Sequence, residues 1–481
     1  MGALSSEMDI NNYLTIEALE DGLTVSLSTN ACEYCVDGDG NWKSLAADTT
    51  TEAINTGQTL SFRGELTPQY STGIGTFTIS KKYNLKGNCM SMLFGDEAII
   101  KYSLSDKMYA FKSLFYNCTN VVNVSSNFLP ATTLGSYCYE HMFWGCTSLT
   151  TAPELPATTI KYGCYSGMFG SCTSLTTAPE LPATTLFTGC YDYMFKGCTS
   201  LITAPELPAT TLADSCYDNM FSGCTSLVNA PELPATTLGS YCYDNMFYGC
   251  TSLTTAPELP ATTLADNCYS YMFYGCTSLT VAPALPATTL GNRCCEYMFY
   301  GCTSLTTAPT VLPATTLTIC CYQYMFYGCT SLTTAPALPA TTLADYCYRH
   351  MFHKCTKLNY IKALFTTTPS TTYTSNWVNG VASTGTFVKN KDATWNVTGV
   401  HGIPEGWTVV NLITFTIDGT EYQAEEGMTW LTWHNTPYNT TDYLSTGHDS
   451  IIHVYAETYL YKGATKVKGT DIITSSAYTF K

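Results

Sequence analysis

The chain has 481 residues, of which only 12% are charged, and its formal net charge at pH 7 is -16. This length predicts two to four domains rather than one compact core. The excess of carboxylates argues against partners with phosphate backbones or anionic membranes, because those partners require clustered lysine and arginine. We therefore expect neither nucleic-acid binding nor membrane insertion.

The N-terminal segment MGALSSEMDINNYL lacks a basic stretch followed by an apolar one, and no run of 18 apolar residues occurs in the chain. Both observations predict the absence of an export signal and of a spanning helix. Residues 1–85 then alternate apolar and polar side chains, as in Leu23–Leu27. Such alternation predicts a small, sandwich-like β domain.

Two motifs in this first domain suggest metal chemistry. Cys32 and Cys35 form a single CxxC pair, without a second pair at zinc spacing. The run that starts at Asp37-Gly38 resembles the beginning of a calcium loop, but Trp42 stands where such a loop needs glycine. We interpret the first motif as part of a strand and the second as a hairpin turn, and we predict no metal site here.

A repeat of 26 residues fills the middle of the chain. The string M-F-x-G-C-T-S-L or a close variant begins at Met142, Met168, Met194, Met220, Met246, Met272, Met298 and Met325. A worn ninth copy begins at Met351, and degenerate copies at Leu114 and Trp377 flank the array. Atypical end copies are what capping of a stacked array requires. Residues 86–410 are therefore predicted to form a repeat solenoid with degenerate caps.

Each repeat has the same predicted anatomy. Cys138, Met142 and Cys146 stand at i, i+4 and i+8, which predicts about two helical turns with one buried face. Thr147–Thr151 favours a short strand, and the prolines that follow in APELP end that strand because they cannot donate to a ladder. We expect a coil of one short parallel strand and one helical turn.

The F-x-G-C-T-S-L core and the L-P arc resemble the BspA-like class of leucine-rich repeats. This class occurs in surface proteins of gut and oral bacteria and in fibre-like proteins of their tailed phages. Its repeats usually carry an aliphatic residue where this chain has Cys138 and its equivalents. The resemblance therefore implies that these cysteines pack in the core.

The same resemblance implies a non-enzymatic role. It points to a fibre, spike or decoration protein of a virion, assembled in the host cytoplasm and docked on other virion proteins through a terminal β domain. The solenoid would then recognise a host cell-surface glycan or protein, and a homo-oligomer is possible. A bacterial cell-surface adhesin and an intracellular interaction scaffold are the two alternatives.

Eighteen of the 24 cysteines form nine pairs, one in each repeat, and the members of each pair are eight positions apart. We interpret both columns as buried free thiols, since unpaired cysteine is among the most buried residue types. A chain without an export signal is made in a reducing compartment, which disfavours disulfides. Disulfides and a column of metal-binding thiolates are the alternatives.

No signature of a nucleophile elbow, nucleotide-binding loop or zinc protease occurs, so we predict no catalytic residue, cofactor or metal. The repeats instead vary at two positions of their expected outer edge, where aromatics could stack on sugars or fill a protein interface. The alternative is neutral drift. The predicted binding residues are Trp144, Tyr248, Tyr274, Tyr300 and Tyr327 at one position, and Tyr193, Tyr271, Tyr297 and Tyr324 at the other.

Two further groups have simpler interpretations. Five glutamates recur at one repeat position and would form a like-charge column, which we expect to be solvated rather than bound to a cation. These are Glu154, Glu180, Glu206, Glu232 and Glu258. His350, His353 and Cys355 in the last repeat are interpreted as solvent-facing cap residues. Residues 366–410 should close the solenoid, and residues 411–481 should form a C-terminal β domain.

Overall fold

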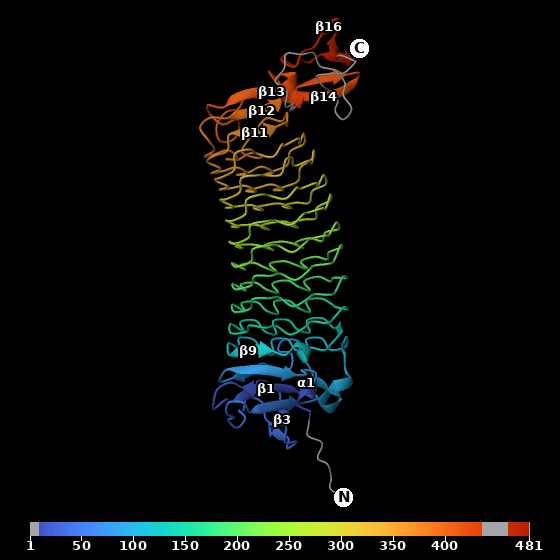
Figure 1. The fold of residues 1–481 in the computed structure, drawn as a ribbon, viewed down its shortest axis with the longest axis vertical. Coiled ribbons are helices and arrows are strands. Elements are labelled where there is room, and N and C mark those ends of the chain that lie inside the picture. Colours follow the sequence, from blue (N-terminus) through green and yellow to red (C-terminus); the bar gives the residue numbers. More distant parts are fainter. Residues whose placement is uncertain (1–8, 435–459, 481) are drawn as a thin grey trace.

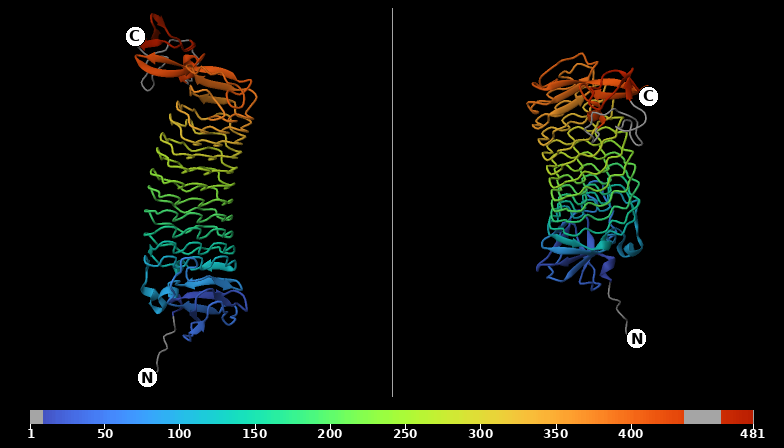
Figure 2. Two further views of the ribbon diagram at one scale, coloured as in Figure 1. Left: turned by 180° about the vertical axis from the view of Figure 1, so that it is seen from behind. Right: turned by 45° about the horizontal axis from the view of Figure 1, so that its top comes forward.

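The computed structural model describes residues 9–434 and 460–480. Residues 1–8, 435–459 and 481, which belong to the two predicted terminal domains, lie outside the described residues. Figure 1 shows a column of stacked coils that connects an N-terminal sheet to a C-terminal one, and the two views of Figure 2 show the same order from other directions. The long axis of the column follows the order of the repeats.

A six-stranded sheet, ordered β4-β3-β5-β1-β7-β9, closes the N-terminal end of the column. Its strands are β1 (Leu14–Ala18), β3 (Cys32–Val36), β4 (Lys43–Leu45), β5 (Thr59–Arg63), β7 (Tyr83–Gly87) and β9 (Val121–Val124). Two strand pairs and four short helices complete this end: β2 (Val25–Leu27) with β6 (Phe77–Ile79), β8 (Ser103–Leu104) with β10 (Thr133–Leu134), η1 (Ile10–Asn12), α1 (Ser91–Phe94), η2 (Gly95–Ile100) and η3 (Ser126–Phe128). The predicted turn at Asp37-Gly38 is confirmed as the hairpin between β3 and β4, with positive φ at both residues.

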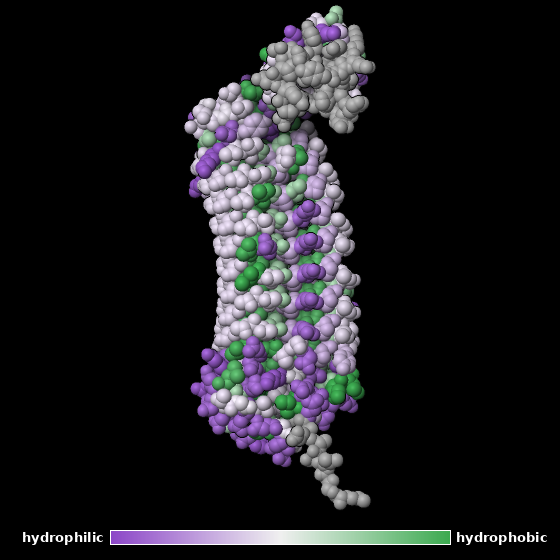
Figure 3. All heavy atoms as spheres, viewed as in Figure 1, coloured by the Kyte–Doolittle hydropathy of each residue, from purple (hydrophilic) through white to green (hydrophobic). Residues whose placement is uncertain are grey.

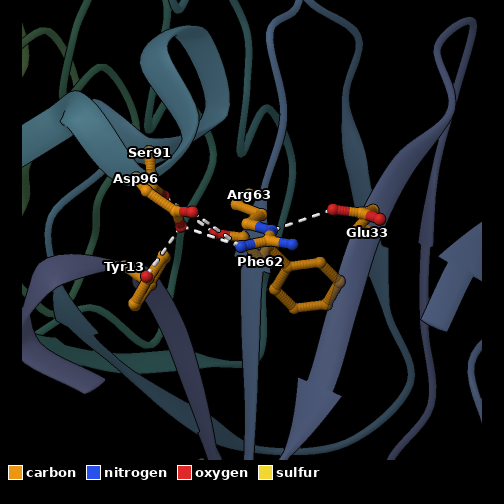
Figure 4. A network of polar contacts seen from close by, with 6 residues as sticks. All are labelled: Tyr13, Glu33, Phe62, Arg63, Ser91 and Asp96. Atoms are coloured by element: carbon orange, nitrogen blue, oxygen red, sulfur yellow. Dashed lines mark hydrogen bonds and ion pairs between the residues drawn. The ribbon is translucent and has the colours of Figure 1, made fainter. Parts of the chain in front are cut away.

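Arg63 ties the last residue of β5 to two neighbouring elements (Figure 4). Its Nε lies 2.8 Å from a carboxylate oxygen of Glu33, and its Nη1 lies 2.8 Å from Asp96. The Tyr13 hydroxyl donates to the same Asp96 carboxylate, and this hydrogen bond, together with Arg63, lowers the pKa of Asp96. The guanidinium also stacks on Trp42. The charge of Arg63 thus balances that of the two carboxylates beside it, Glu33 and Asp96, which favours a structural role for this network.

The segment that was predicted to be helical is instead a chain of successive β-turns, and that prediction is wrong. Between residues 137 and 146, alternate N–H groups bond to the carbonyl three residues back, as in Met142 to Tyr139. The N–H groups between them, such as that of Phe143, donate to the next repeat, here to Met168. We call this segment and its equivalents the turn ribbon. A helix would use all of its donors internally, whereas the ribbon keeps half of them for stacking.

Left-handed residues explain the spacing of four that resembled a helix. Tyr137, His141 and Gly145 all have positive φ, between 53° and 75°, and the same positions are left-handed in the other repeats. A type II turn requires such a residue at its third position. The interval of four therefore measures the distance between left-handed residues, and it still places Cys138, Met142 and Cys146 in the core with no exposed surface.

The predicted strand at Thr147–Thr151 is also shorter than expected. Only Thr151 takes part in a parallel bridge, to Asn123, and residues at the same position of other repeats form similar bridges, such as Asn229 to Thr255. A second row of single bridges begins at Thr133 and Thr159. The prolines of the following arc lack an N–H group, so the ladder cannot lengthen into true strands there. The solenoid consequently contains mostly turns and isolated bridges, and no closed sheet.

One hydrophobic core runs from Leu14 to Trp407 without interruption. Its centre is a stack of phenylalanine rings, in which Phe143 and Phe169 lie 5.7 Å apart with nearly parallel planes. A parallel stack of buried tyrosines, represented by Tyr165 and Tyr191, lies beside it. The N-terminal sheet therefore shares its core with the first repeats, and the domain boundary at residues 85–86 stays a prediction.

The second cysteine of every repeat is both buried and hydrogen-bonded. The Sγ of Cys172 lies 3.1 Å from the carbonyl oxygen of Phe143, and each of the nine repeats makes the same contact. The same carbonyl accepts the N–H of Cys146. A thiol fills the volume of a small apolar side chain and also donates to this carbonyl, which an aliphatic residue cannot do.

We predict that none of the 24 thiols reacts quickly with a thiol reagent in the native protein, whereas all 24 react after denaturation without reductant. All of them are buried and free of disulfides. Burial also raises the thiol pKa, to about 12 for Cys250, so the reactive thiolate is scarce. The measurement is a colorimetric thiol titration, with Thr176→Cys at an exposed position as the control. A smaller total after denaturation would reveal disulfides.

The C-terminal end of the column regains true strands. β11 (Tyr360–Ala363), β12 (Thr386–Asn390) and β13 (Thr408–Ile417) pair in parallel, and β14 (Thr420–Glu425) and β17 (Ala477–Phe480) flank β13. The remaining elements are α2 (Trp430–His434), β15 (Leu460–Lys462) and β16 (Thr465–Lys466). A second, smaller core extends from Ile413 to Tyr478. The boundary predicted at residues 410–411 stays a prediction, and part of that domain lies outside the described residues.

Candidate binding face

The turn ribbon presents two columns of stacked rings over the last five repeats. In the first column the centroids of Tyr248, Tyr274 and Tyr300 are 4.6 Å apart, and Tyr327 and then His353 extend the stack. In the second column Tyr271, Tyr297 and Tyr324 are 4.5 Å apart, and His350 closes the stack. These nine residues are called the ring columns below: Tyr248, Tyr274, Tyr300, Tyr327, His353, Tyr271, Tyr297, Tyr324 and His350.

The ring columns line an open groove with a volume of about 400 Å³. Within one repeat the two rings are tilted against each other, as for Tyr297 and Tyr300, whose centroids are 5.7 Å apart at an angle of 41°. The rings are half-buried or exposed, whereas the phenylalanine that precedes each ring of the first column is fully buried. Seven of the nine predicted binding residues therefore meet in one groove.

The other two predicted residues lie outside the groove. The Trp144 ring covers Gly170 of the next repeat so closely that a Cβ at that glycine would lie 2.1 Å from it. His141 covers Gly167 in the same way. Tyr193 has Lys196 above its ring, at 4.8 Å from the centroid. Between Trp144 and Tyr248, the position of the first column is occupied by the small or polar residues Gly170, Lys196 and Ser222.

The second column is built on strained backbone. Tyr271, Tyr297 and Tyr324 all have φ near +55°, a region that costs a non-glycine residue about 1–2 kcal/mol. Other repeats have Gly167 or Asn245 at the same position, and these residue types tolerate positive φ. The backbone conformation therefore does not explain why these positions carry tyrosine, which favours a role for the tyrosine side chains.

Coils lie closer together at the ring columns than in the core. Tyr248 and Tyr274 are 4.6 Å apart, whereas their neighbours Phe247 and Phe273 are 5.6 Å apart. The rings that line the groove are therefore stacked more closely than the rings of the core.

Three half-buried acidic side chains were missed by the sequence analysis. Asp192, Asp218 and Asp244 occupy the same position in three successive repeats, which come before the first tyrosine of the second column, Tyr271. Burial raises their pKa values to about 7, 6 and 7, and repulsion between neighbouring carboxylates adds to the shift at Asp192 and Asp244. The recurrence of an acid two residues before M-F was visible in the sequence, but its burial was not.

Cations gather at the C-terminal end of the groove. The Arg349 guanidinium lies 5.9 Å from the Tyr324 ring, and the Lys354 ammonium lies 5.4 Å from the Tyr327 ring. Within residues 9–434 and 460–480, neither has a carboxylate at ion-pair distance. Arg293, near the same end, is paired with Glu296. This end of the groove is positively charged although the chain as a whole is acidic.

The prediction of a solvent-facing residue is wrong for Cys355, which is buried and donates to the Phe326 carbonyl. His350 and His353 are half-buried and line the groove. The two histidines end the ring columns, with their Nδ1 atoms 3.0 Å apart. Burial, followed by repulsion from His353 and Arg349, lowers the pKa of His350 to about 4. Both rings therefore stack as neutral imidazoles near pH 7.

The predicted glutamate column lies on another face, next to the proline arcs. Its five residues are all exposed, and none forms an ion pair in the described part of the chain. Shallow grooves of about 460 to 540 Å³ lie between successive arcs. Figure 3 shows hydrophilic residues that recur along one face of the solenoid. Solvation of these carboxylates accounts for the arrangement.

The side chains at the ring columns are suited to binding. The groove is lined by tyrosine and histidine rings, which offer apolar contact area together with polar hydroxyl and imidazole atoms to a bound molecule. Within the described residues, no group of three or more histidine, cysteine or acidic side chains could hold a metal ion. No helix in that part is long and apolar enough to cross a membrane.

Comparison with known proteins identifies the repeat. A family profile described as "BspA type leucine rich repeat region (6 copies)" matches residues 91–228, 137–280, 190–333 and 267–376, which together span more than half of the chain. No curated protein matches the chain. Proteins built from such repeats are typically non-enzymatic and are often found at cell surfaces.

Two solved structures are among those similar to parts of the chain. One is a leucine-rich repeat protein from Bacteroides ovatus, 18% identical, with a TM-score of 0.30 over 62% of this chain and 86% of that one. The other is a complex of TLR13 with a single-stranded RNA, 11% identical, with a TM-score of 0.21 over 66% of this chain and 53% of that one. These values are too low to support further argument.

Proposed function

Because the chain belongs to the family of BspA-type leucine-rich repeat proteins, we propose that it is a non-enzymatic recognition protein that binds its target through the ring columns. The observation that carries this proposal is the groove between the columns, built on backbone that other repeats relax with glycine or asparagine. Tyrosine gives a large, rigid contact area at a low cost in side-chain entropy, which suits a recognition surface.

The target is a cell-surface glycan or protein, and the carrier of the solenoid is a virion. In this proposal a terminal domain attaches to other virion proteins, and the face with the ring columns points outward. The resemblance to fibre-like phage proteins supports this carrier, whereas the family itself is equally compatible with a bacterial surface adhesin. Detection of the protein in purified phage particles, or in the surface fraction of a bacterium, separates the two carriers.

We predict that the double variant Tyr297→Ser, Tyr300→Ser binds target cells at least about tenfold more weakly than the wild type. The two rings lie in the middle of the groove, so their removal interrupts both columns. The measurement is binding of the labelled full chain to bacterial and host cells, and to a glycan array. Tyr162→Ser, at an exposed position away from the ring columns, is the control. Unchanged binding by the double variant would refute the proposal.

A further inference from the structure

The faces of the rings inside the columns are already occupied by other rings. Tyr274 has Tyr248 on one face and Tyr300 on the other, each at 4.6 Å, and Tyr297 is enclosed in the same way. Only ring edges and hydroxyl groups reach the groove. A sugar that stacks on aromatics needs an open ring face, so the stacking on sugars that the sequence suggested does not fit these columns.

The shape of the groove suits an extended chain. The five rings of the first column span about 18 Å, which corresponds to five or six residues of an extended polypeptide at about 3.3 Å per residue. The apolar sides of the two columns can receive side chains, while the hydroxyl groups can pair with backbone N–H and C=O groups. A polypeptide offers both kinds of group along its length.

The charge at the C-terminal end selects for an anion. Arg349 and Lys354 stand beside the last two tyrosines. In the described structure neither has a carboxylate at ion-pair distance, although Arg349 is close enough to Glu296 to lower the pKa of that carboxyl group. The peptide groups of the turn ribbon add to this field, because their N–H groups point toward the C-terminal end in every repeat, as from His141 to Ser166 and from Tyr324 to Arg349. Aligned peptide dipoles place their positive end where the N–H groups point.

We infer that the groove binds an extended acidic segment of a partner polypeptide, whose carboxylates lie against Arg349 and Lys354. This inference rests on the proposed function, and it names the class of target. Guanidinium groups recognise carboxylates with paired hydrogen bonds, and the ammonium group adds a point charge.

The test uses the full chain and a fluorescent decapeptide of alternating glutamate and valine. Its affinity, measured by anisotropy, should exceed that of the matched lysine-valine peptide by about tenfold or more. Lys354→Glu and Arg349→Glu should each weaken binding of the acidic peptide by about tenfold. Lys357→Glu makes the same charge change three residues away, at an exposed position outside the groove, and should have little effect.

Three outcomes would overturn the inference. These are equal binding of the two peptides, no binding of the acidic peptide, and binding of polygalacturonate with the same dependence on Arg349 and Lys354, which would identify an acidic glycan instead. The proposed function can fail separately. If the serine variants at Tyr297 and Tyr300 lose cell binding but acidic peptides do not compete with it, the recognition role stands and the acidic segment does not.

Discussion

Replacing Phe247 with alanine should destabilise the repeats around it by about 3–5 kcal/mol. The side chain has no exposed surface and is stacked between Phe221 and Phe273, at 5.7 and 5.6 Å. Its loss would leave a cavity that the neighbouring coils cannot close, because both are fixed by hydrogen bonds between their turn ribbons. Urea unfolding, with hydrogen exchange to locate the change, measures this effect.

The next residue in the chain provides a matched control. Tyr248 is 37% exposed and begins the first ring column. Tyr248→Ala should cost about 1 kcal/mol or less, since an exposed ring contributes little to the core. An equal loss of stability in the two variants would show that the ring columns serve to hold the solenoid together, and would remove the main reason for assigning them to recognition.

The half-buried acids should make the solenoid more stable in mild acid. We predict that the triple variant Asp192→Asn, Asp218→Asn, Asp244→Asn is more stable than the wild type at pH 8, and that this difference vanishes near pH 4. A carboxyl group whose folded pKa is raised from 3.8 to about 7 contributes full stability below its unfolded pKa and loses it as the pH rises through the folded value. The gain should be on the order of 1–2 kcal/mol per site, after allowance for partial exposure.

Comparison with the wild type at each pH isolates this effect. His350 titrates over the same range with the opposite sign, because its pKa is lowered to about 4 and its neutral form is favoured by folding. That contribution is present in both proteins and cancels in the difference. Thermal unfolding between pH 4 and pH 8 is the measurement, and a difference that does not change with pH would contradict the assigned pKa shifts.

The sequence alone was sufficient for the repeat and its buried positions. Conserved spacing within the chain placed Cys138, Met142, Phe143 and Leu149 together, and all four are fully buried. The same spacing gave the wrong local conformation. An interval of four residues is shared by an α-helix and by a ribbon of turns with a left-handed residue at every fourth position, and a pattern of burial does not distinguish them.

The candidate site was located by sequence variation, but its chemistry was not. Variation among repeats at Tyr248 and Tyr271 marks an outer edge, yet it does not reveal that each ring covers the next. That contact depends on the separation of the coils at this face, a property of the stacked array as a whole. For the same reason His350 and His353 resembled cap residues, although they continue the two columns.

The direction of the hydrogen bonds between coils gives the column two unlike ends. Each turn ribbon donates half of its N–H groups to carbonyls of the coil that follows. The first ribbon therefore has carbonyls that no preceding coil bonds, and the last ribbon has N–H groups with no following coil to accept them. At the first end, the N-terminal sheet supplies a donor, since the Phe77 N–H bonds to the Leu114 carbonyl, 2.8 Å away. At the last end, the C-terminal segment supplies an acceptor, since Nδ1 of His401 accepts the N–H of Asn376.

The two caps are therefore not interchangeable, but the coils between them are. An additional copy of 26 residues could enter at any junction, accept from the coil before it and donate to the coil after it, and leave both caps unchanged. The length of the recognition face can thus vary by whole repeats through duplication or deletion of gene segments. Near-identical copies from Met246 to Met325 are what such a history would leave behind.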